Sequence, residues 1–483
     1  MLRTICSLLL LPFAAALAAE PSLTIYNQNF AVVRGSVPLD LKEGVNQIHF
    51  ADLTAQTDPS SVVLRDPAGA NTFQVLEQNY RGTPIDQALM LAQFEGQTID
   101  FLVHEPTKPD TTIAGKIIRS GTRRGSESQA LIEVNGKLRF ELPGVPLFPK
   151  LADNSVLKPE LIWKIASEKP AKFAAEITYL TLGLNWGADY NVILPARGNS
   201  MQLPCLVTID NQSGKDFENA RTKLVAGDVN KAVPKTAPAP MEATTERTIV
   251  TGSYIPTPEK AFEDFHLYTL PRPVTLRDSE STQIELLRAA DVPSEQRYVF
   301  DATGYDEGPL SFSSTPVLEE NWGVEGEARV AVLRVVKNSE ANHLGMPLPG
   351  GRWRFYRQDG DGQLEFVGEH EEPHTPKDET LRIFTGAAFD LTAKRRQTDF
   401  AVDRTKHTMD EAFEIKLRNH KTEPVELQVV EHLNRWQSWE IVEHSADFTK
   451  RDAHTIEFVV SLKPDEEKTL SYRARYTQLP ANL

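Results

Sequence analysis

The chain has 483 residues, of which 40% are apolar and 25% charged, and it contains 32 Pro, 27 Gly and only 2 Cys. This composition excludes a collagen-like, a disulfide-dense or a wholly disordered chain, and the length predicts two to four domains of roughly 100–200 residues each. The formal net charge of -15 argues against nucleic-acid binding, because an acidic surface repels a phosphate backbone.

The N-terminus has the pattern of an export signal. Arg3 precedes a short apolar run over residues 8–17, and the small residues Ala18 and Ala19 follow it. These features predict a cleavable secretory signal over residues 1–19. The run is shorter than the roughly 20 apolar residues that cross a bilayer, and no later stretch reaches that length. The sequence therefore predicts no membrane span.

Strand signals dominate residues 20–165, where we expect an N-terminal β domain. Short runs rich in apolar and β-branched residues, separated by turn residues, predict strands over residues 24–26, 31–33, 62–64, 73–77, 99–103, 131–134 and 138–140. Asn135-Gly136, between the last two, is a strong β-hairpin signal. One short helix is expected over residues 85–94, because Pro84 precedes it and Gly96 follows it.

A central β domain is expected over residues 166–400. Cys205 lies in the apolar run 203–207 and has no neighbouring His to activate its thiol, so we expect a buried structural cysteine. Residues 229–260 interrupt this domain with a segment that is rich in Pro, Thr and Ala and has little aliphatic periodicity. They predict a flexible insert, either a solvated connector or a segment that folds on a partner.

The clearest strand alternation lies in residues 401–483. Apolar residues alternate with charged ones over 413–418, and the same period of two recurs at 425–429, 456–460 and 470–476. Such strands, separated by turn clusters with no helix between them, predict an antiparallel sandwich of immunoglobulin-like size. The expected fold class is therefore mainly β, with two or three antiparallel β-sandwich-type domains, the C-terminal one immunoglobulin-like.

Two motifs resemble metal sites. His370-Glu371-Glu372-Pro373-His374 matches a zinc-protease pattern that needs a helix to place two His one turn apart. Pro373 would break such a helix and the flanking residues read as strands, so we expect a polar loop. Asp359-Gly360-Asp361-Gly362 has the spacing of the start of a calcium loop, but oxygen ligands do not follow where the ion needs them. A hairpin turn is the better interpretation, and we predict no metal and no cofactor.

Aromatic side chains beside carboxylates give the one positive hint of a ligand site. No nucleophile elbow, phosphate-binding loop or dinucleotide fingerprint is present, and we predict no catalytic residue. Rings can stack on sugars while polar groups bind the hydroxyls, and carboxylates about 5–10 Å apart would suit a glycosidase. The alternative is that these rings pack in the core or between domains. The candidate ligand-binding residues are Trp186, Asp189, Tyr190, Trp436, Trp439 and Glu440.

The chain resembles a family of secreted bacterial proteins that carry a domain of unknown function and are related to the mucoidy-inhibitor-A-like proteins. The likeness covers about 165–483. It implies an exported, mainly β protein, located in the periplasm or secreted, and it assigns no activity, cofactor or catalytic residue. The matching stretches are residues 176–181 leading to Trp186, 188–190, 224–229, 348–351 leading to Tyr356, 387–390 and 414–441.

We therefore expect an exported, non-enzymatic protein of the cell envelope that acts as a scaffold or binding module. Its partner would be another envelope protein or a polysaccharide. The alternative function is a binder or hydrolase of envelope polysaccharide that uses an aromatic-lined groove with carboxylates. The alternative requires Trp186, or Trp436 and Trp439, to be exposed in a cleft beside Asp189 or Glu440.

Overall fold

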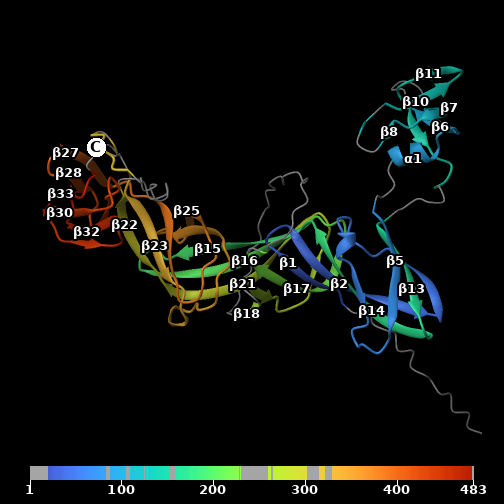
Figure 1. Ribbon diagram of the computed structural model, residues 1–483, viewed down its shortest axis with the longest axis horizontal. Helices are drawn as coiled ribbons and strands as arrows, with labels where there is room; N and C mark the ends of the chain where they lie inside the picture. The colour runs from blue at the N-terminus through green and yellow to red at the C-terminus, as the bar shows by residue number, and fades with distance from the viewer. Residues whose placement is uncertain are drawn as a thin grey trace, which may run out of the picture. The chain divides into compact units, whose positions relative to one another are not determined.

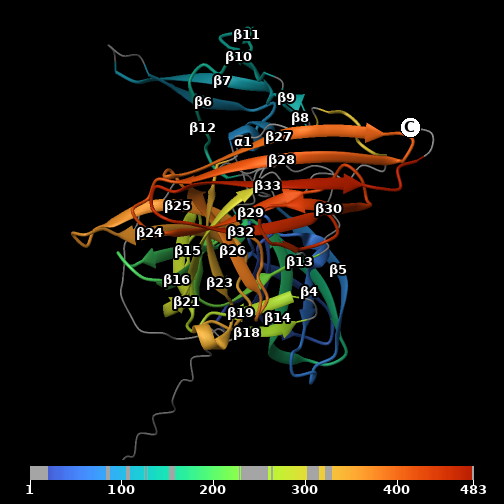
Figure 2. The same ribbon diagram turned by 90° about the vertical axis from the view of Figure 1, so that its left-hand side faces the viewer.

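The computed structural model is built mainly of β-strands (Figures 1 and 2). The mainly β fold class predicted from the sequence is confirmed, and the short helix predicted over residues 85–94 is present as α1 (Gln87–Gln93). The signal predicted over 1–19 and most of the insert predicted over 229–260 lie outside the described residues. The structure describes residues 20–82, 87–104, 109–123, 126–127, 129–151, 158–227, 229, 259–262, 265–301, 315–320, 322 and 329–480.

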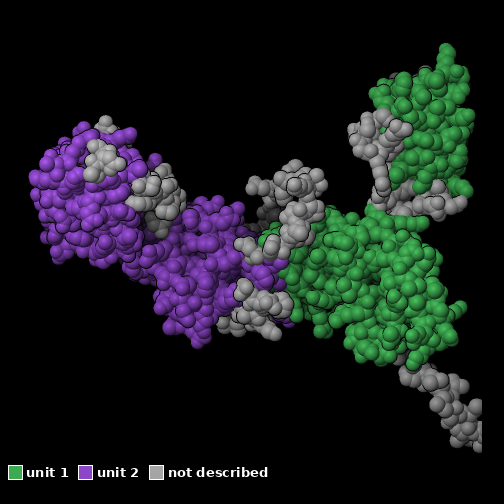
Figure 3. Space-filling model, viewed as in Figure 1, with its two compact units in different colours: residues 1–185, 209–224, 272–282 green, residues 186–208, 225–271, 283–483 purple. Residues whose placement is uncertain are grey.

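The chain forms two compact units (Figure 3). Unit 1 comprises residues 1–185, 209–224 and 272–282, and unit 2 comprises residues 186–208, 225–271 and 283–483. Each unit is thus assembled from segments that are far apart in the sequence. The domain boundaries predicted at 165 and 400 stay predictions. Strands with residues in both units are β15 (Leu184–Leu194), β16 (Ser200–Asn211), β17 (Phe217–Ala226) and β21 (Glu280–Pro293).

Unit 1 is built around a long antiparallel strand pair, β2 and β14. Their register runs from Leu41 opposite Ala171 to Phe30 opposite Leu182. Val37 and Leu39 are buried while their neighbour Pro38 is exposed, because successive side chains of a strand point to opposite faces. The elements of this part are β1 (Ser22–Tyr26), β2 (Phe30–Leu41), β3 (Gly44–Phe50), η1 (Pro59–Ser61), β4 (Val63–Arg65), β5 (Phe73–Arg81), β13 (Glu160–Ser167), β14 (Ala171–Leu182) and β20 (Val274–Leu276).

A second sheet of unit 1, with strand order β11-β10-β7-β6-β12, packs against α1 through a small apolar core. The predicted Asn135-Gly136 hairpin is confirmed, with Val134 opposite Lys137. Asn135 and Gly136 have φ values of 50° and 74°, as a two-residue hairpin turn requires. Its strands are β6 (Thr98–Val103), β7 (Thr111–Arg119), β10 (Leu131–Val134), β11 (Lys137–Arg139) and β12 (Val145–Leu147), and β8 (Thr122–Arg123) and β9 (Ser126–Glu127) pair separately as a two-stranded sheet.

One sheet of unit 2 joins β15 and β16 to β24 (Gly351–Gln358) and β25 (Leu364–Glu372). β15 pairs with β24 in parallel, and β24 pairs with β25 as a hairpin. The turn between β24 and β25 is Asp359–Gly362, so the hairpin predicted there is confirmed. Cys205 on β16 is fully buried, as expected, and this burial raises the pKa of its thiol.

The zinc-protease pattern lies on extended chain. His370 belongs to β25, and His374 follows the end of that strand, where its Nδ1 accepts a hydrogen bond from the Gly350 backbone N–H over 2.8 Å. The helix that would bring the two imidazoles together is therefore not formed at this position. Across the described part of the chain, no three His, Cys, Asp or Glu side chains come together in a group able to hold a metal ion.

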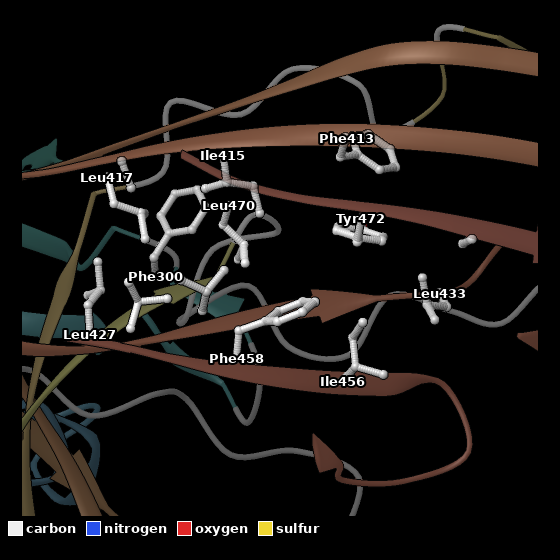
Figure 4. Packing of buried hydrophobic residues seen from close by; sticks show 14 of the residues in the cluster. Phe300, Phe413, Ile415, Leu417, Leu427, Leu433, Ile456, Phe458, Leu470 and Tyr472 are labelled. Atoms are coloured by element: carbon white, nitrogen blue, oxygen red, sulfur yellow. The ribbon is translucent and has the colours of Figure 1, made fainter. Parts of the chain in front are cut away.

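Another part of unit 2 is a sandwich of a four-stranded sheet, β27-β28-β33-β30, and a six-stranded sheet, β26-β23-β22-β29-β32-β31. Figure 4 shows side chains of both sheets meeting in one core, among them Phe413 and Tyr472 from the first sheet and Leu427 and Phe458 from the second. The alternation predicted in residues 401–483 therefore marks the core-facing strands. The sandwich also takes strands from before residue 401, because β22 pairs in parallel with β29.

The strands of unit 2 whose bounds have not yet been given lie between residues 259 and 476. None of the helices in the described part of the chain is long and apolar enough to cross a membrane. The elements are β18 (Glu259–Phe262), β19 (Phe265–Thr269), β22 (Glu295–Asp301), β23 (Ala331–Lys337), η2 (Glu340–Asn342), β26 (Thr380–Ala387), β27 (Leu391–Asp403), β28 (Thr408–Asn419), β29 (Val425–His432), β30 (Trp439–His444), β31 (Phe448–Lys450), β32 (Thr455–Leu462) and β33 (Glu467–Tyr476).

Candidate functional site

The predicted site residues Trp186, Asp189 and Tyr190 all lie on β15, but on two faces. Trp186 and Tyr190 are 3% and 0% exposed, and their polar atoms bond to backbone: Trp186 Nε1 donates to Val225 O and Tyr190 Oη to Pro349 O. Burial raises the pKa of Tyr190 well above its usual value. Asp189 lies on the other face and accepts hydrogen bonds from Arg354 and Thr208, each over 2.9 Å.

The second predicted group, Trp436, Trp439 and Glu440, is also divided. Trp436 is buried in the sandwich core, and Trp439 packs against the same core while remaining partly exposed. Trp439 Nε1 donates to Ala453 O, and the Lys450 ammonium lies 4.4 Å from its ring centre. Glu440, the next residue along β30, is exposed to solvent.

The alternation of side chains between the two faces of a strand explains why the residues of each predicted group do not lie together. Adjacent strand residues point to opposite faces, so Asp189 cannot lie beside the Tyr190 ring, nor Glu440 beside the Trp439 ring. The buried rings of Trp186, Tyr190 and Trp436 agree with the packing alternative, since a sugar cannot stack on a ring with no solvent-facing side. Asp189 and Glu440 lie on different sheets, on β15 and β30. The predicted combination of ring and carboxylate is not assembled at either place.

Two arginines are buried in the sandwich with carboxylate partners. Arg395 Nε lies 2.9 Å from an oxygen of the fully buried Glu431, which also accepts a hydrogen bond from Tyr472. Arg435 Nε lies 2.6 Å from Glu411. A buried charge is stable when it is paired and its remaining donors are bonded. Arg435 meets this condition with backbone carbonyl acceptors at Val317, Glu319, Glu320 and Trp322.

A cavity of about 660 Å³ lies in unit 2, lined by residues of both its five-stranded and its six-stranded sheets. This volume is within the range of small-molecule binding sites. The lining contains seven charged side chains, which makes it more polar than a typical apolar ligand pocket. The lining residues are Leu194, Glu295, Gln296, Arg297, Tyr298, Val332, Arg334, Arg357, Val367, Thr385, Gly386, Ala387, Lys421, Glu423, Pro424, Val425, Glu426 and Gln428.

Arg334 is the unusual residue of this cavity. Its side chain extends from the central strand β23, and the residue is only 3% exposed. Nη2 donates to Gln296 Oε1 over 2.7 Å, whereas Nη1 has no hydrogen-bond partner among the described residues. Burial and the neighbouring Arg357 lower the pKa of Arg334 to about 10. Arg357 lines the same cavity and donates a hydrogen bond from Nη1 to the Pro195 carbonyl oxygen over 3.2 Å, and among the described residues no ion pair joins Arg334 or Arg357 to a carboxylate.

A hydrogen-bonded chain on β22 extends from Arg334. Gln296 Nε2 donates to Tyr298 Oη over 2.7 Å, and Lys421 Nζ donates to the same oxygen over 2.8 Å. Since the Tyr298 oxygen accepts both bonds, its own hydrogen remains to be donated. Within the described residues it has no bonded acceptor. The lining of the cavity therefore includes the Tyr298 hydroxyl, whose hydrogen has no described acceptor, and Arg334, whose Nη1 is buried without a hydrogen-bond partner.

The other charged side chains around the cavity are paired. Arg297 binds Glu295 over 2.8 Å, and Lys421 lies 3.8 Å from Glu423. Glu426 is the third acidic side chain of the lining. Along β22, Glu295 and Arg297 alternate with Gln296 and Tyr298, so the Arg297–Glu295 pair points to the opposite face of the sheet from Arg334.

A second cavity, of about 460 Å³, lies on the six-stranded sheet and contains a histidine–carboxylate pair. His432 Nε2 lies 3.1 Å from Asp301 Oδ2, and Thr455 Oγ1 lies 3.3 Å from the other ring nitrogen. The hydrogen bond to Asp301 raises the pKa of His432. Both ring nitrogens of His432 therefore already have partners within the protein.

Sequence reasoning did not find Arg334, although the sequence carries a signal for it. The run Ala331-Val332-Leu333-Arg334-Val335-Val336 places one charged residue in the middle of an aliphatic strand. Such a strand is buried on both faces, so its arginine must be desolvated and needs a partner.

Comparison with protein families gives one match, to the domain of unknown function DUF4139, over residues 175–478. No curated protein matches the chain. The matched segment contains every residue that lines the cavity around Arg334, so this cavity is part of that domain. The match covers more than half of the chain, and we conclude that the protein belongs to the family that carries the DUF4139 domain of unknown function.

Proposed function

We propose that this protein is an exported, non-enzymatic binding module of the cell envelope, and that the cavity around Arg334 is its binding site. The observation that supports this proposal is that a cavity large enough for a ligand is lined by Arg334, a buried arginine that has no countercharge and one nitrogen without a hydrogen-bond partner. Leaving a buried cation without a partner costs folding free energy. A binding site gives a reason for a fold to retain such a group.

A polar ligand fits this cavity better than the aromatic groove considered from the sequence. The lining offers arginine, lysine, glutamine and tyrosine donors together with glutamate acceptors, and its one ring, that of Tyr298, is covered by Lys421 at 4.9 Å. Export, an envelope location and the relation to mucoidy-inhibitor-A-like proteins are part of the proposal. The N-terminal pattern supports export, and the resemblance over residues 165–483 supports the relation.

A cavity-blocking variant tests the proposal. Val367 lines the cavity and is 41% exposed, so Val367→Trp would place an indole at its mouth. Val442, which is 37% exposed on β30 and does not line the cavity, gives the matched control Val442→Trp. We expect the mature chain and V442W to retain the same component of a native envelope fraction, measured by quantitative mass spectrometry and glycan analysis. V367W should lose it, and equal retention by all three would refute the assignment of the cavity.

A further inference from the structure

The outer face of the five-stranded sheet of unit 2 carries an exposed row of apolar side chains. Ile193 on β15, Tyr356 on β24 and Phe366 on β25 are register partners on three adjacent strands, so their side chains share one face. The rings of Tyr356 and Phe366 meet edge to face, with 5.8 Å between their centroids. Phe366 is 56% exposed, and Leu364 on the same strand is 44% exposed. An apolar patch that crosses several strands, unlike a single exposed residue, indicates a contact surface.

Polar side chains continue this face beside the rings. Arg354, two residues before Tyr356 on β24, donates from Nη1 to Asp189 Oδ1 over 2.9 Å, and its Nε lies 3.3 Å from Glu369 Oε2. Asp189 also accepts a hydrogen bond from Thr208 over 2.9 Å. These groups hold one another in place. An arginine and a carboxylate each have more hydrogen-bonding capacity than the contacts named here use, so the face offers both donors and acceptors to a ligand.

The shape and charge of this face favour a neutral sugar chain. Small-molecule sites are concave, whereas these residues line neither of the two cavities described above. A basic peptide would have to displace Arg354 from its two carboxylates. An anionic ligand would meet Asp189, Glu369 and the exposed Glu371, which is two residues further along β25. Sugar hydroxyls both donate and accept hydrogen bonds, and they carry no charge.

The two rings supply the apolar half of such a site. An all-equatorial pyranose presents C–H groups on both of its faces, and these groups pack against an aromatic ring, whose face is electron-rich. At roughly 3.3 Å per residue, the backbone of β24 from Arg352 to Tyr356 spans about 13 Å, which is longer than one sugar ring. The face therefore has the length for consecutive sugar units, one against the rings and the next beside Arg354.

We propose that this outer face of β15, β24 and β25 binds a neutral polysaccharide, with one sugar ring against Tyr356 and Phe366 and neighbouring hydroxyls on the polar groups around Arg354. The site is separate from the cavity around Arg334 and goes beyond the function proposed for that cavity. Asp189, which the sequence placed with the buried rings of its own strand, contributes here beside exposed rings of two other strands.

Calorimetric titration of the full-length mature chain with neutral hexasaccharides tests this inference. The probes are cellohexaose, chitohexaose and xylohexaose, and we expect at least one of them to bind saturably. Phe366→Leu keeps an apolar side chain but removes the ring, so it should weaken binding of that probe by about tenfold or more, whereas Phe366→Tyr keeps the ring and should bind within about twofold of the unmodified chain.

Phe389→Leu is the matched control, because Phe389 is 96% exposed but lies between β26 and β27, away from this face. We expect F389L to bind the hexasaccharide as the unmodified chain does. The inference is overturned if no hexasaccharide binds, if F366L binds as tightly as F389L, or if the anionic chain polygalacturonate binds more tightly than the neutral probes. A dimer that sedimentation velocity detects and that F366L abolishes would assign the patch to a second copy of this chain, and would also overturn it.

This inference and the proposal for the cavity fail separately. Phe366 does not line the cavity around Arg334, so absence of hexasaccharide binding leaves the cavity proposal standing. Arg334→Met changes the cavity and not the outer face, and it should bind the hexasaccharide within about twofold of the unmodified chain, because distant sites act independently. Loss of hexasaccharide binding in R334M would place the sugar in the cavity and overturn the assignment to the outer face.

Discussion

Unit 2 buries three arginines in two different ways. In the sandwich core, Arg395 and Arg435 each lie within 3 Å of a glutamate, and each of these glutamates also accepts a hydrogen bond from a tyrosine. At the cavity, Arg334 has a hydrogen bond to a glutamine, a second arginine near by and a buried nitrogen without a hydrogen-bond partner. The first arrangement holds the fold together, whereas the second lowers stability unless something binds. Burial of a charge therefore does not by itself indicate function, but burial without a countercharge does.

The largest expected effect is in the sandwich core. Glu431→Gln would remove the carboxylate that pairs with the buried Arg395, and breaking a buried pair in this way costs about 3–5 kcal/mol of the free energy of unfolding. Glu414→Gln is the control, because its partner Arg396 has a side chain that is 72% exposed and such pairs contribute less than about 1 kcal/mol. Urea unfolding followed by tryptophan fluorescence measures both. Equal losses in the two variants would mean that burial of the pair does not matter.

Substitution of Arg334 at the cavity should raise the free energy of unfolding, whereas substitution of Glu431 lowers it. Arg334→Met keeps most of the side-chain stem and removes an unpaired charge, so we expect the free energy of unfolding without ligand to rise by about 1–2 kcal/mol. The same urea measurement detects this change. A loss of stability as large as that of E431Q would show that Arg334 is a structural residue, and the contrast between the two regions would disappear.

The pair in the second cavity gives a smaller, pH-dependent effect. Because Asp301 raises the pKa of His432, the stabilisation is fully present below the ordinary histidine pKa of 6.5 and is lost as the pH rises through the pKa of the folded state. Asp301→Asn should therefore cost up to about 1 kcal/mol at pH 5.5 and less at pH 8. An NMR titration of His432 should give a midpoint above 6.5, and this midpoint should fall in the variant. An unchanged midpoint would contradict the assignment.

The smallest effect is expected at a residue that the sequence placed in the candidate site. Glu440 is exposed on β30, so Glu440→Gln should change the free energy of unfolding by less than about 0.5 kcal/mol. It should also leave retention of the envelope component unchanged in the assay used for V367W. Loss of retention in E440Q would move the binding surface from the cavity to the sandwich.

The sequence predicts those features that depend on neighbouring residues. The Asn135-Gly136 hairpin, the turn at Asp359–Gly362, helix α1 and the alternating strands of the sandwich all follow from local patterns, and each is present. The candidate site depended instead on side chains meeting in space. Asp189 and Tyr190 are adjacent in the sequence, and in a strand this adjacency separates them.

The cavity around Arg334 could not be predicted from neighbouring residues either, because its lining comes from strands that are far apart in the sequence. Arg334 and Gln296 are cross-strand neighbours on β23 and β22, while Arg357 belongs to a strand of the other sheet. No sequence pattern states which strands become neighbours. The aliphatic run around Arg334 predicts a buried charge, and the structure is needed to show that this charge faces a cavity rather than a glutamate.

The parallel pairing of β22 with β29 has a consequence for how the protein folds. It joins residues 298–301 to residues 427–430, and the similar pairing of β15 with β24 joins residues 188–194 to residues 351–357. Contacts between such distant segments form slowly, because a long loop must close before they stabilise the chain. β15 and β22 therefore cannot complete their pairing until partner strands more than a hundred residues later in the chain have been synthesised. A chain cut before residue 425 would leave the edge of β22 open to pairing with other molecules.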